Sequence, residues 1–216
     1  MRRAAIRTIS KKAFTILLFL KAPRAGFVKT RIGKTLGDDQ ALDIYRWLVR
    51  RLMGALPKGA AVEIHFAPAD AGKEMEDWLG SEVLYTPQCE GDLGDRMEHA
   101  VLAAFERGAE SVVCLGADCP SLMPEEINDA VSKLEKGADA VFGPTHDGGY
   151  YLLGLRHFHS EIFREIPWST ERTLEVSLDR AANAGLKVGL LDKKSDIDEA
   201  ADWETFCREN PNIIPR

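Results

Sequence analysis

The chain has 216 residues, of which 45% are hydrophobic and 29% are charged, so disordered and fibrous classes are excluded and one ample globular domain is expected. Its 28 Lys and Arg residues stand against 34 Asp and Glu residues, which gives a formal net charge of −6. This acidic balance does not favour a nucleic-acid partner, because neutralising phosphates requires a basic surface.

The amino-terminal region combines a basic segment with an apolar run. Residues 1–13 are expected to be a frayed basic tail, and residues 14–210 to form the single domain. The run from Phe14 to Leu20 imitates a signal peptide, but it is too short to span a bilayer and no small-residue cleavage site follows it. Because the run lacks polar alternation, we expect a strand that is covered on both faces of a parallel sheet.

Strand and helix patterns alternate along the rest of the chain. A loop is expected from Lys21 to Gly37, with Asp38 as the N-cap of the following helix. Further strands are predicted at 62–66, 83–85, 111–115, 138–143, 150–155 and 187–191. Helices are predicted at 38–56, 71–79, 97–105, from 124 onward, at 171–184 and at 199–209. This alternation predicts an α/β fold, with a mostly parallel sheet in a three-layer α/β/α arrangement.

Three polar segments each follow a predicted strand, where ligands bind in open α/β sheets. The first segment, 21–34, has five basic residues and no acid, and its glycines let backbone N–H groups approach an anion. The residues expected to bind phosphate are Lys21, Arg24, Gly26, Lys29, Thr30 and Arg31. The alternative is a solvated basic loop, and the segment is not a Walker A loop.

The second segment contains a lone carboxylate, Asp118, directly after a buried strand. A hard oxygen ligand at this place suits Mg²⁺, which takes one or two carboxylates and completes its coordination with substrate phosphates. The alternative is that Asp118 caps the helix that begins near Pro124.

The third segment, 143–151, carries two adjacent glycines, Gly148 and Gly149, before an aromatic strand. Such glycines let the backbone pass close to a flat ligand or a sugar, and Asp147 could hold a hydroxyl group or a metal. The alternative is a plain Asp-Gly turn between two strands.

Two weaker segments follow in the chain. Residues 167–170 form either a loop on the ligand side or a capping box, with Ser169 and Glu171 placed before a helix. Residues 195–202 offer a second metal carboxylate, Asp196 or Asp198, although stabilisation of the helix dipole would also explain these acids.

Several other chemistries lack their sequence motifs. The chain has no GxSxG, HExxH or GxGxxG, which argues against a serine hydrolase, a zinc protease and a nicotinamide dinucleotide enzyme. Four cysteines have neither zinc-ligand nor disulfide-scaffold spacing: Cys89, Cys114, Cys119 and Cys207. We therefore expect reduced thiols in a cytoplasmic protein without a membrane span.

Six motifs occur in order between residue 14 and about residue 202. In one-letter code they are KAPRxGxVKTR at 21–31, GDLGxRM at 91–97, GxDCP at 116–120, DGGYY at 147–151, PWST at 167–170 and DID at 196–198. On these motifs the chain resembles the bacterial GT-A-like glycosyltransferase, or nucleotide-diphospho-sugar transferase, family of the DUF2064 type. That family is related to the guanylyltransferases that make molybdenum-cofactor and F420 precursors.

The resemblance implies a GT-A type fold, with a nucleotide-binding half in the first strands and an acceptor half after Asp118. It makes loop 21–31 the pyrophosphate cradle and Asp118 the metal-binding aspartate. Asp118 and Lys29 are then the expected catalytic residues, and Asp118 and Asp198 the expected ligands of Mg²⁺ or Mn²⁺. The acceptor side is expected to comprise Asp147, Gly148, Gly149, Tyr150 and Trp168.

The reaction itself stays open among related possibilities. The loop lacks the Gly-x-Gly-Thr-Arg form of sugar-nucleotide pyrophosphorylases, and a single acid, Asp118, stands where many GT-A enzymes have Asp-x-Asp. Glycosyl transfer from a nucleotide-sugar and nucleotidyl transfer from a nucleoside triphosphate to a phosphorylated acceptor are both divalent-metal-dependent, and both need a small-molecule acceptor. A non-catalytic nucleotide-binding module is the hypothesis from another class.

Overall fold

The computed structural model describes residues 14–213, and one sheet runs through all of it. The strands are β1 (Thr15–Lys21), β2 (Ala61–Ala67), β3 (Leu84–Pro87), β4 (Val112–Leu115), β5 (Ala140–Pro144), β6 (Tyr150–Leu155) and β7 (Val188–Leu190). Their order across the sheet is β3-β2-β1-β4-β6-β5-β7. Neighbouring strands are parallel except where β6 pairs antiparallel with β4 and β5. The predicted α/β class and mostly parallel sheet are confirmed.

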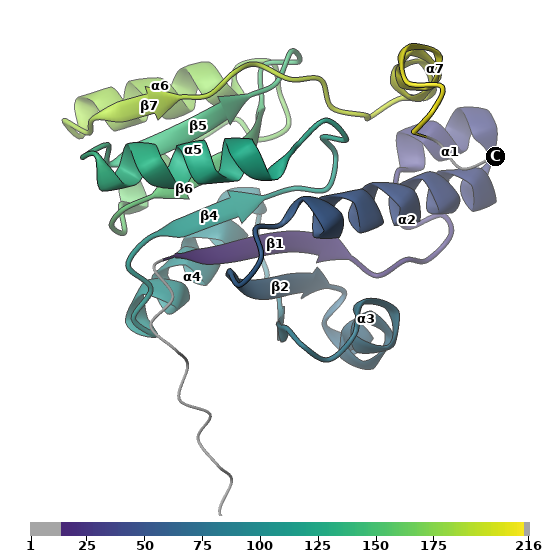
Figure 1. Cartoon of the computed structure of the whole chain (residues 1–216), viewed down its shortest axis with the longest axis horizontal. Helices are drawn as coiled ribbons and strands as arrows, with labels where there is room; N and C mark the ends of the chain where they lie inside the picture. Colours follow the sequence, from purple (N-terminus) through teal and green to yellow (C-terminus); the bar gives the residue numbers. More distant parts are fainter. Residues whose placement is uncertain (1–13, 214–216) are drawn as a thin grey trace, which may run out of the picture.

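Helices cover both faces of the sheet (Figure 1). They are α1 (Thr30–Leu36), α2 (Asp38–Ala55), α3 (Gly72–Leu79), α4 (Leu93–Glu106), α5 (Pro124–Glu135), α6 (Thr173–Asn183) and α7 (Ala200–Glu209). The first core cluster packs the sheet against α2, α3 and α5, and the second packs it against α4 and α6. The three-layer prediction is therefore also confirmed. Among residues 14–213, no helix is long and apolar enough to cross a membrane.

Strand β1 shows why the first apolar run has no polar alternation. Leu18 packs in the cluster that contains α2, whereas its neighbour Leu17 packs in the cluster that contains α4. Both side chains are fully buried, because successive side chains of a strand point to opposite faces and both faces are covered.

The segment after β1 differs from its prediction as a loop. It contains the short helix α1, whose Ile32 is buried against α2. The sequence pattern is hard to detect because Gly33 interrupts it and basic residues surround it. The following helix also begins differently, since Gly37 is its N-cap and Asp38 is its first residue. The predicted tail, 1–13, lies outside the described residues.

A third, smaller core cluster joins α7 to α1 and α2. Ile197 is 2% exposed within this cluster, and the rings of Trp203 and Phe206 pack against Trp47. The parallel strands run toward the side on which α1 and α7 lie (Figure 1). The cluster therefore fixes the segment before α7 at the carboxyl edge of the sheet.

Candidate functional site

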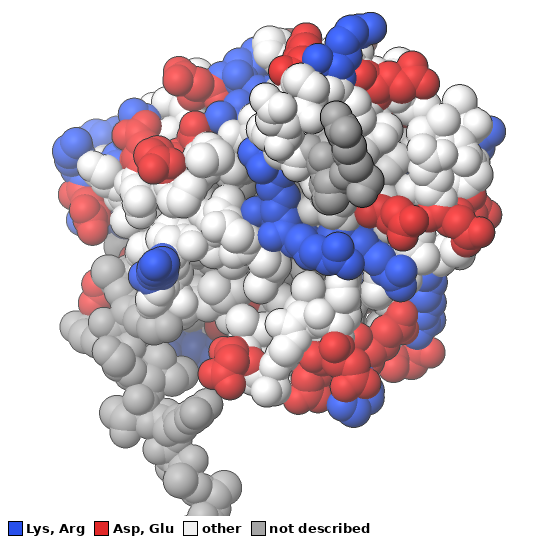
Figure 2. Space-filling view, turned by 45° about the vertical axis from the view of Figure 1, so that its right-hand side comes forward, with Lys and Arg blue, Asp and Glu red and all other residues white. Residues whose placement is uncertain are grey.

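A cavity of about 500 Å³ opens at the carboxyl ends of β1 and β4. Its polar lining residues are Lys21, Lys29, Thr30, Arg31, Asp118, Ser169 and Asp198. Figure 2, which turns this side of the molecule forward, shows a band of basic side chains with acidic patches beside it. Four segments that are far apart in sequence thus meet at one opening, namely residues 21–31, Asp118, Ser169 and Asp198.

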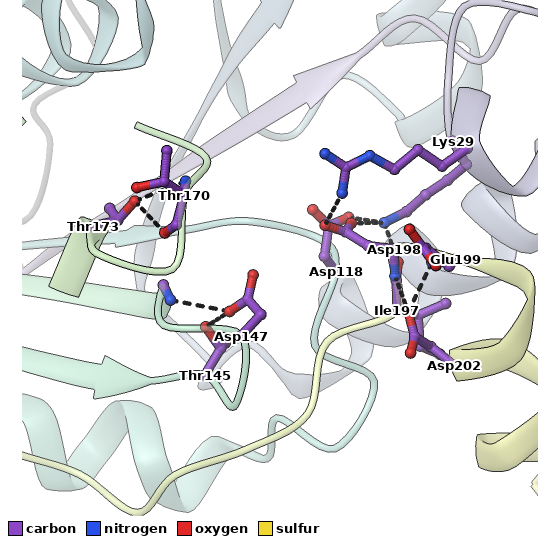
Figure 3. A network of polar contacts seen from close by, with 12 residues as sticks. Lys29, Asp118, Thr145, Asp147, Thr170, Thr173, Ile197, Asp198, Glu199 and Asp202 are labelled. Carbon is purple, nitrogen blue, oxygen red and sulfur yellow. Dashed lines mark hydrogen bonds and ion pairs between the residues drawn. The ribbon is translucent and has the colours of Figure 1, made fainter. Parts of the chain in front are cut away.

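Lys29 lines this cavity and contacts both Asp118 and Asp198 (Figure 3). Its side chain is 6% exposed, and its ammonium nitrogen lies 2.7 Å from Asp118 Oδ1 and 3.1 Å from Asp198 Oδ1. It also donates to the backbone carbonyl of Ile197. Burial lowers the pKa of Lys29, but attraction to the two carboxylates outweighs burial, so the pKa is raised overall. Lys29 is therefore charged at neutral pH in this site.

The backbone of Lys29 is itself unusual. Its φ of 45° and ψ of 45° place it in the left-handed region, which costs a residue with a side chain about 1–3 kcal/mol. Ser169, which lines the same cavity, has a φ of 60°. A residue keeps such a strained backbone conformation when contacts with its surroundings hold it in place. For Lys29 the ion pairs with Asp118 and Asp198 are such contacts.

Asp118 is a partner of Lys29 and not a helix cap. Helix α5 begins at Pro124, and its N-cap is Met123, so the capping alternative is wrong. The backbone carbonyl of Asp118 accepts a hydrogen bond of 2.8 Å from the N–H of Ile197. The loop after β4 is thus joined to the segment before α7 through both backbone and side chains.

Asp147 lies in the tight connection between β5 and β6. Its Oδ1 accepts hydrogen bonds from Thr145 Oγ1 at 2.5 Å and from the N–H of Gly149 at 3.0 Å. The N–H of Thr145 also donates to the carbonyl of Gly149. The segment is therefore the Asp-Gly turn considered above, and this turn fixes the carboxylate of Asp147 (Figure 3).

Asp147, Asp196 and Asp198 form an acidic triad, with one carboxylate oxygen of each lying within 4.8 Å of the others. The triad lines a second cavity of about 230 Å³. Ile197 is buried between the two later acids, so in this extended segment Asp196 and Asp198 face the opening. Burial, followed by the charges of Asp147 and Asp198, raises the pKa of Asp196 to about 6.

The donor set of the triad suits a hard divalent cation. Three carboxylate oxygens at mutual distances below 4.8 Å are ligands of the type that Mg²⁺ and Mn²⁺ take. The expected pair, Asp118 and Asp198, is brought together, but the ammonium of Lys29 lies between these two carboxylates. Within the triad, Asp198 is paired with Lys29 and Arg31, whereas Asp147 and Asp196 have no ion-pair partner among the described residues.

The predicted phosphate-binding residues divide into two groups. Arg31 lines both cavities, and its guanidinium lies 3.8 Å from Asp198, while Lys21 lines the larger cavity with its ammonium 5.7 Å from the ring of Phe27. Arg24 instead pairs with Glu74 at 2.8 Å. Neither Arg24 nor the described residue Gly26 lines either cavity. Arg24, a residue expected to bind phosphate, is thus held at helix α3 by Glu74 and not at either cavity.

The residues expected on the acceptor side are only partly accessible. Gly149, Tyr150 and Trp168 line the smaller cavity, but Gly148 does not. A Cβ atom on Gly148 would overlap the backbone of Glu171. Glycine is therefore needed here so that the backbone of Glu171 can pack against the turn, and not to leave space for a ligand. Tyr150 packs edge-on against Trp168, with ring centroids 6.3 Å apart.

The capping alternatives for the two weaker segments have different outcomes. Helix α6 begins at Thr173, and Ser169 lines both cavities, so the capping box proposed for Ser169 is wrong. At the start of α7, Glu199 and Asp202 form the capping box. Asp196 and Asp198 are thus left to face the opening.

Two further residues shape the site although the sequence predicts no role for them, namely Gly94 of the GDLGxRM motif and Tyr45. Gly94 at the start of α4 lets Trp168 approach, since a Cβ there would lie 2.5 Å from Trp168 Nε1. The hydroxyl of Tyr45 accepts from the N–H of Lys21 at 2.8 Å and donates to its carbonyl at 2.9 Å, fixing the end of β1. Tyr45 carried no distinct signal, because it falls on the apolar stripe of its helix.

The chain is similar to a family of bacterial proteins and to several solved structures. The family model described as "Uncharacterized protein conserved in bacteria (DUF2064)" matches residues 54–170. A proposed nucleotide-diphospho-sugar transferase from Desulfovibrio desulfuricans G20 superposes with a TM-score of 0.88 at 34% identity, over 93% of this chain and 89% of that one. No curated protein matches the chain in sequence.

More distant structures share the fold. One is CMP:2-keto-3-deoxy-manno-octonic acid synthetase complexed with CTP, at a TM-score of 0.56 and 10% identity over 93% of this chain and 100% of that one. Another is the inositol-1-phosphate CTP transferase from T. maritima, at a TM-score of 0.54 and 15% identity over 95% and 100%. At these identities the likeness concerns the fold alone.

Proposed function

The chain belongs to the DUF2064 family of bacterial proteins, and on this premise we propose that it is a divalent-metal-dependent transferase that uses a nucleotide-sugar or a nucleoside triphosphate. The Desulfovibrio relative, which shares 34% identity, is named as a proposed nucleotide-diphospho-sugar transferase. That name supports glycosyl transfer as the first form of the proposal. The proposed transferase domain comprises residues 14–210.

One observation carries the proposal: cations and carboxylates converge at the carboxyl edge of the sheet. Lys29 and Arg31 provide positive charge, whereas Asp118 and the acidic triad provide four carboxylates. A diphosphate brought to this opening would be repelled by Asp147 and Asp196, the two acids of the triad without an ion-pair partner among the described residues. A divalent ion on the triad removes that repulsion, which is why nucleotide and metal belong together in the proposal.

Each residue has a separate part in this proposal. Arg31 and Lys29 lie on the nucleotide side and offset the negative charge of the phosphates. Asp118 orients Lys29 through the 2.7 Å ion pair. Asp196 and Asp198, together with Asp147, would hold Mg²⁺ or Mn²⁺, and the ion when bound supplies further positive charge at the phosphates. Positioning and electrostatics suffice for such a transfer, so no covalent nucleophile is assigned.

A small-molecule acceptor is proposed to enter through the smaller cavity. Tyr150 and Trp168 provide an apolar wall there, and Asp147 provides a carboxylate that a hydroxyl group could reach. Gly149 lies at the same wall, whereas Gly148 acts on the acceptor side only through the turn. The cavity of about 230 Å³ is large enough for a compact polar molecule.

Nucleotidyl transfer is the second form of the proposal. It is supported by the names of the two more distant structures, a CMP-sugar-acid synthetase and a CTP transferase, although their identities of 10% and 15% speak to fold only. The two forms differ in what leaves: glycosyl transfer releases a nucleoside diphosphate or monophosphate, and nucleotidyl transfer releases pyrophosphate. A cytoplasmic location is also proposed, supported by four free cysteines.

A thermal-shift panel of nucleotides and sugar nucleotides, with and without Mg²⁺ or Mn²⁺, tests the proposal. A ligand at 100 times its dissociation constant stabilises by about 2.7 kcal/mol, which corresponds to a rise of roughly 5–10 °C for a domain of this size. We expect a rise that depends on both nucleotide and metal. A complete lack of response would contradict the proposal, whereas binding without turnover of any acceptor would favour the non-catalytic module.

A further inference from the structure

Lys194 lies in the irregular segment between β7 and α7, two residues before the first acid of the DID motif. Its side chain is 15% exposed. The ammonium nitrogen lies 2.9 Å from Glu126 Oε1 and donates to the carbonyl of Ser121 at 3.1 Å. Lys194 thereby contacts the loop that follows Asp118 and the first turn of α5.

The backbone of Lys194 contacts a different part of the site. Its N–H donates to the carbonyl of Pro144 at 3.0 Å, and its carbonyl accepts from the N–H of His146 at 3.1 Å. These two bonds continue the sheet beyond β5, with Thr145 opposite Lys194. His146 directly precedes Asp147, so Lys194 also fixes the turn that carries this acid.

Three acid-bearing segments therefore meet at one residue. The side chain of Lys194 holds the loop of Asp118, its backbone holds the turn of Asp147, and the chain continues from it to Asp196. We propose that Lys194 is a positioning residue, which sets the spacing of these carboxylates. The expected effect of Lys194 on metal binding rests on the function proposed above, but its effect on the positions of the three acid-bearing segments does not.

The ion pair with Glu126 explains why a lysine suits this position. Glu126 uses Oε2 to accept the N–H of Met123 at 2.7 Å in the cap of α5, which leaves Oε1 for Lys194. A partly buried ion pair contributes little net stability, since desolvation offsets attraction. The ion pair therefore matters mainly because it holds Lys194 at a fixed position against Glu126 and Ser121. An apolar side chain of the same length could not make these two contacts.

Native-state hydrogen exchange of the full-length Lys194→Met protein tests this positioning. Two amides report on the geometry, namely the N–H of His146, which bonds to Lys194, and that of Ile197, which bonds to Asp118. We expect both to exchange on the order of tenfold faster than in the original protein, while the N–H of Leu18 in β1 is unchanged. Equal acceleration at Leu18, or no acceleration at His146 and Ile197, would overturn the proposal.

Lys133→Met is the matched control, because Lys133 makes an ion pair of 3.1 Å with Asp129 on α5 but bonds to none of the acid-bearing segments. It should leave both reporter amides unchanged. Glu126→Gln is the second variant should Lys194→Met fail to fold, since it keeps the size of the side chain but removes its charge and leaves one acceptor oxygen in place of two. It should accelerate the same two amides, and their unchanged exchange would refute the role of the ion pair.

Titration with Mn²⁺ then measures the consequence for the site. Loss of a residue that orients metal ligands reduces metal affinity on the order of 10–100-fold, so Lys194→Met should bind Mn²⁺ that much more weakly and Lys133→Met should not. Undiminished affinity in Lys194→Met would contradict the proposal. If the original protein itself binds no Mn²⁺, the proposed metal-dependent function fails, and the exchange experiment still decides whether Lys194 positions these segments.

Discussion

The ammonium nitrogen of Lys29 lies 2.7 Å from a carboxylate oxygen of Asp118, and this ion pair joins the segment after β1 to the loop after β4. Asp198 adds a third segment at 3.1 Å. Lys29 thus neutralises two acids at the same point where it would face a phosphate. Any change at Lys29 should therefore alter both the stability of the chain and its response to cations.

Replacing Lys29 with Met leaves Asp118 and Asp198 facing each other without their shared cation. Removing one partner of a fully buried pair costs about 3–5 kcal/mol, and because both acids are half-exposed we expect about 1–3 kcal/mol. The pKa of Lys29 is raised, so its contribution is fully present below its ordinary pKa and the loss can be measured at pH 7. Urea denaturation measures this loss.

Magnesium should stabilise the Lys29→Met protein more than the original, because an ion can take the place of the lost ammonium. Lys34→Met is the control, since Lys34 is an exposed lysine of α1, the helix that begins directly after Lys29. Equal responses of all three proteins to Mg²⁺ would show that Asp118 and Asp198 do not attract a cation.

Arg31 and Arg24 should behave differently although both belong to the same basic segment. Arg31 lines both cavities, whereas Arg24 pairs with Glu74. Arg31→Ala should weaken nucleotide binding by about 1.5–3 kcal/mol, the scale of a charge-assisted bond, and Arg24→Ala should leave it unchanged. Isothermal titration with the best nucleotide of the thermal-shift panel measures both. Equal losses would mean that Arg24 turns toward the ligand.

The sequence allows the sheet and most helices to be predicted, because their patterns are local. The uniform apolar run of β1 predicts a strand that is buried on both faces, and the apolar stripe of α2 predicts which face of that helix is buried. Helix α1 has no such pattern, since Ile32 is the one buried residue among its seven. Its burial depends on α2 and α7, which no local pattern reveals.

The sequence predicts which segments of the chain form the site, but not which side chains in it form ion pairs with one another. Strand ends predict that segment 21–34, Asp118 and Asp147 are neighbours, whereas the DID motif is predicted only as a source of a second metal carboxylate. Which acid pairs with Lys29, and which acids remain together, depends on side-chain directions set by Ile197 and by the turn of Asp147. Arg24 illustrates the limit, because its partner lies on α3, fifty residues away in sequence.

Metal affinity should separate the triad from Asp118. Asp196→Asn removes a charge from the triad, so Mn²⁺ affinity should fall at least about tenfold. Asp118 is not a member of the triad, so Asp118→Asn should retain most of the Mn²⁺ affinity. It removes the charge that orients Lys29 toward the phosphates, so nucleotide binding and any turnover should be weakened. Titration with Mn²⁺ followed by electron paramagnetic resonance compares the two. A larger loss of Mn²⁺ binding in Asp118→Asn would instead make Asp118 a direct ligand.

The stability of the metal-free protein should depend on pH through Asp196. Burial and the neighbouring acids raise its pKa from 3.8 to about 6, so between these values the folded state holds a proton that the unfolded state has released. Stability from this group is therefore present at low pH and is lost as pH rises from about 4 to 6, after which it is constant. The change should be on the order of 1 kcal/mol, because water screens a partly exposed carboxylate.

Urea denaturation between pH 4 and 7 in the presence of EDTA measures this dependence. Other carboxylates titrate in the same range, and Glu63, whose pKa is lowered overall despite its burial because His65 and Arg107 stabilise its charge, acts in the opposite direction. The difference between the original protein and Asp196→Asn isolates the one group. A difference that does not vary with pH would contradict the raised pKa.

The two glycines of the Asp-Gly turn should respond to alanine in different ways. Gly148 has a φ of 92°, and a Cβ atom there would overlap the backbone of Glu171, which cannot move without displacing the start of α6. Gly148→Ala should therefore cost about 2–5 kcal/mol of stability. At Gly149 an added Cβ atom would lie 3.1 Å from Thr145 Oγ1 and 3.3 Å from Asp147 Oδ1, and both of these side chains can shift. Gly149→Ala should therefore lower the free energy of unfolding by about 1 kcal/mol or less. It should weaken Mn²⁺ binding, because the new methyl group displaces the carboxylate of Asp147. Urea denaturation and Mn²⁺ titration of both variants check this, and a Gly149→Ala protein with undiminished Mn²⁺ affinity would remove Asp147 from the triad.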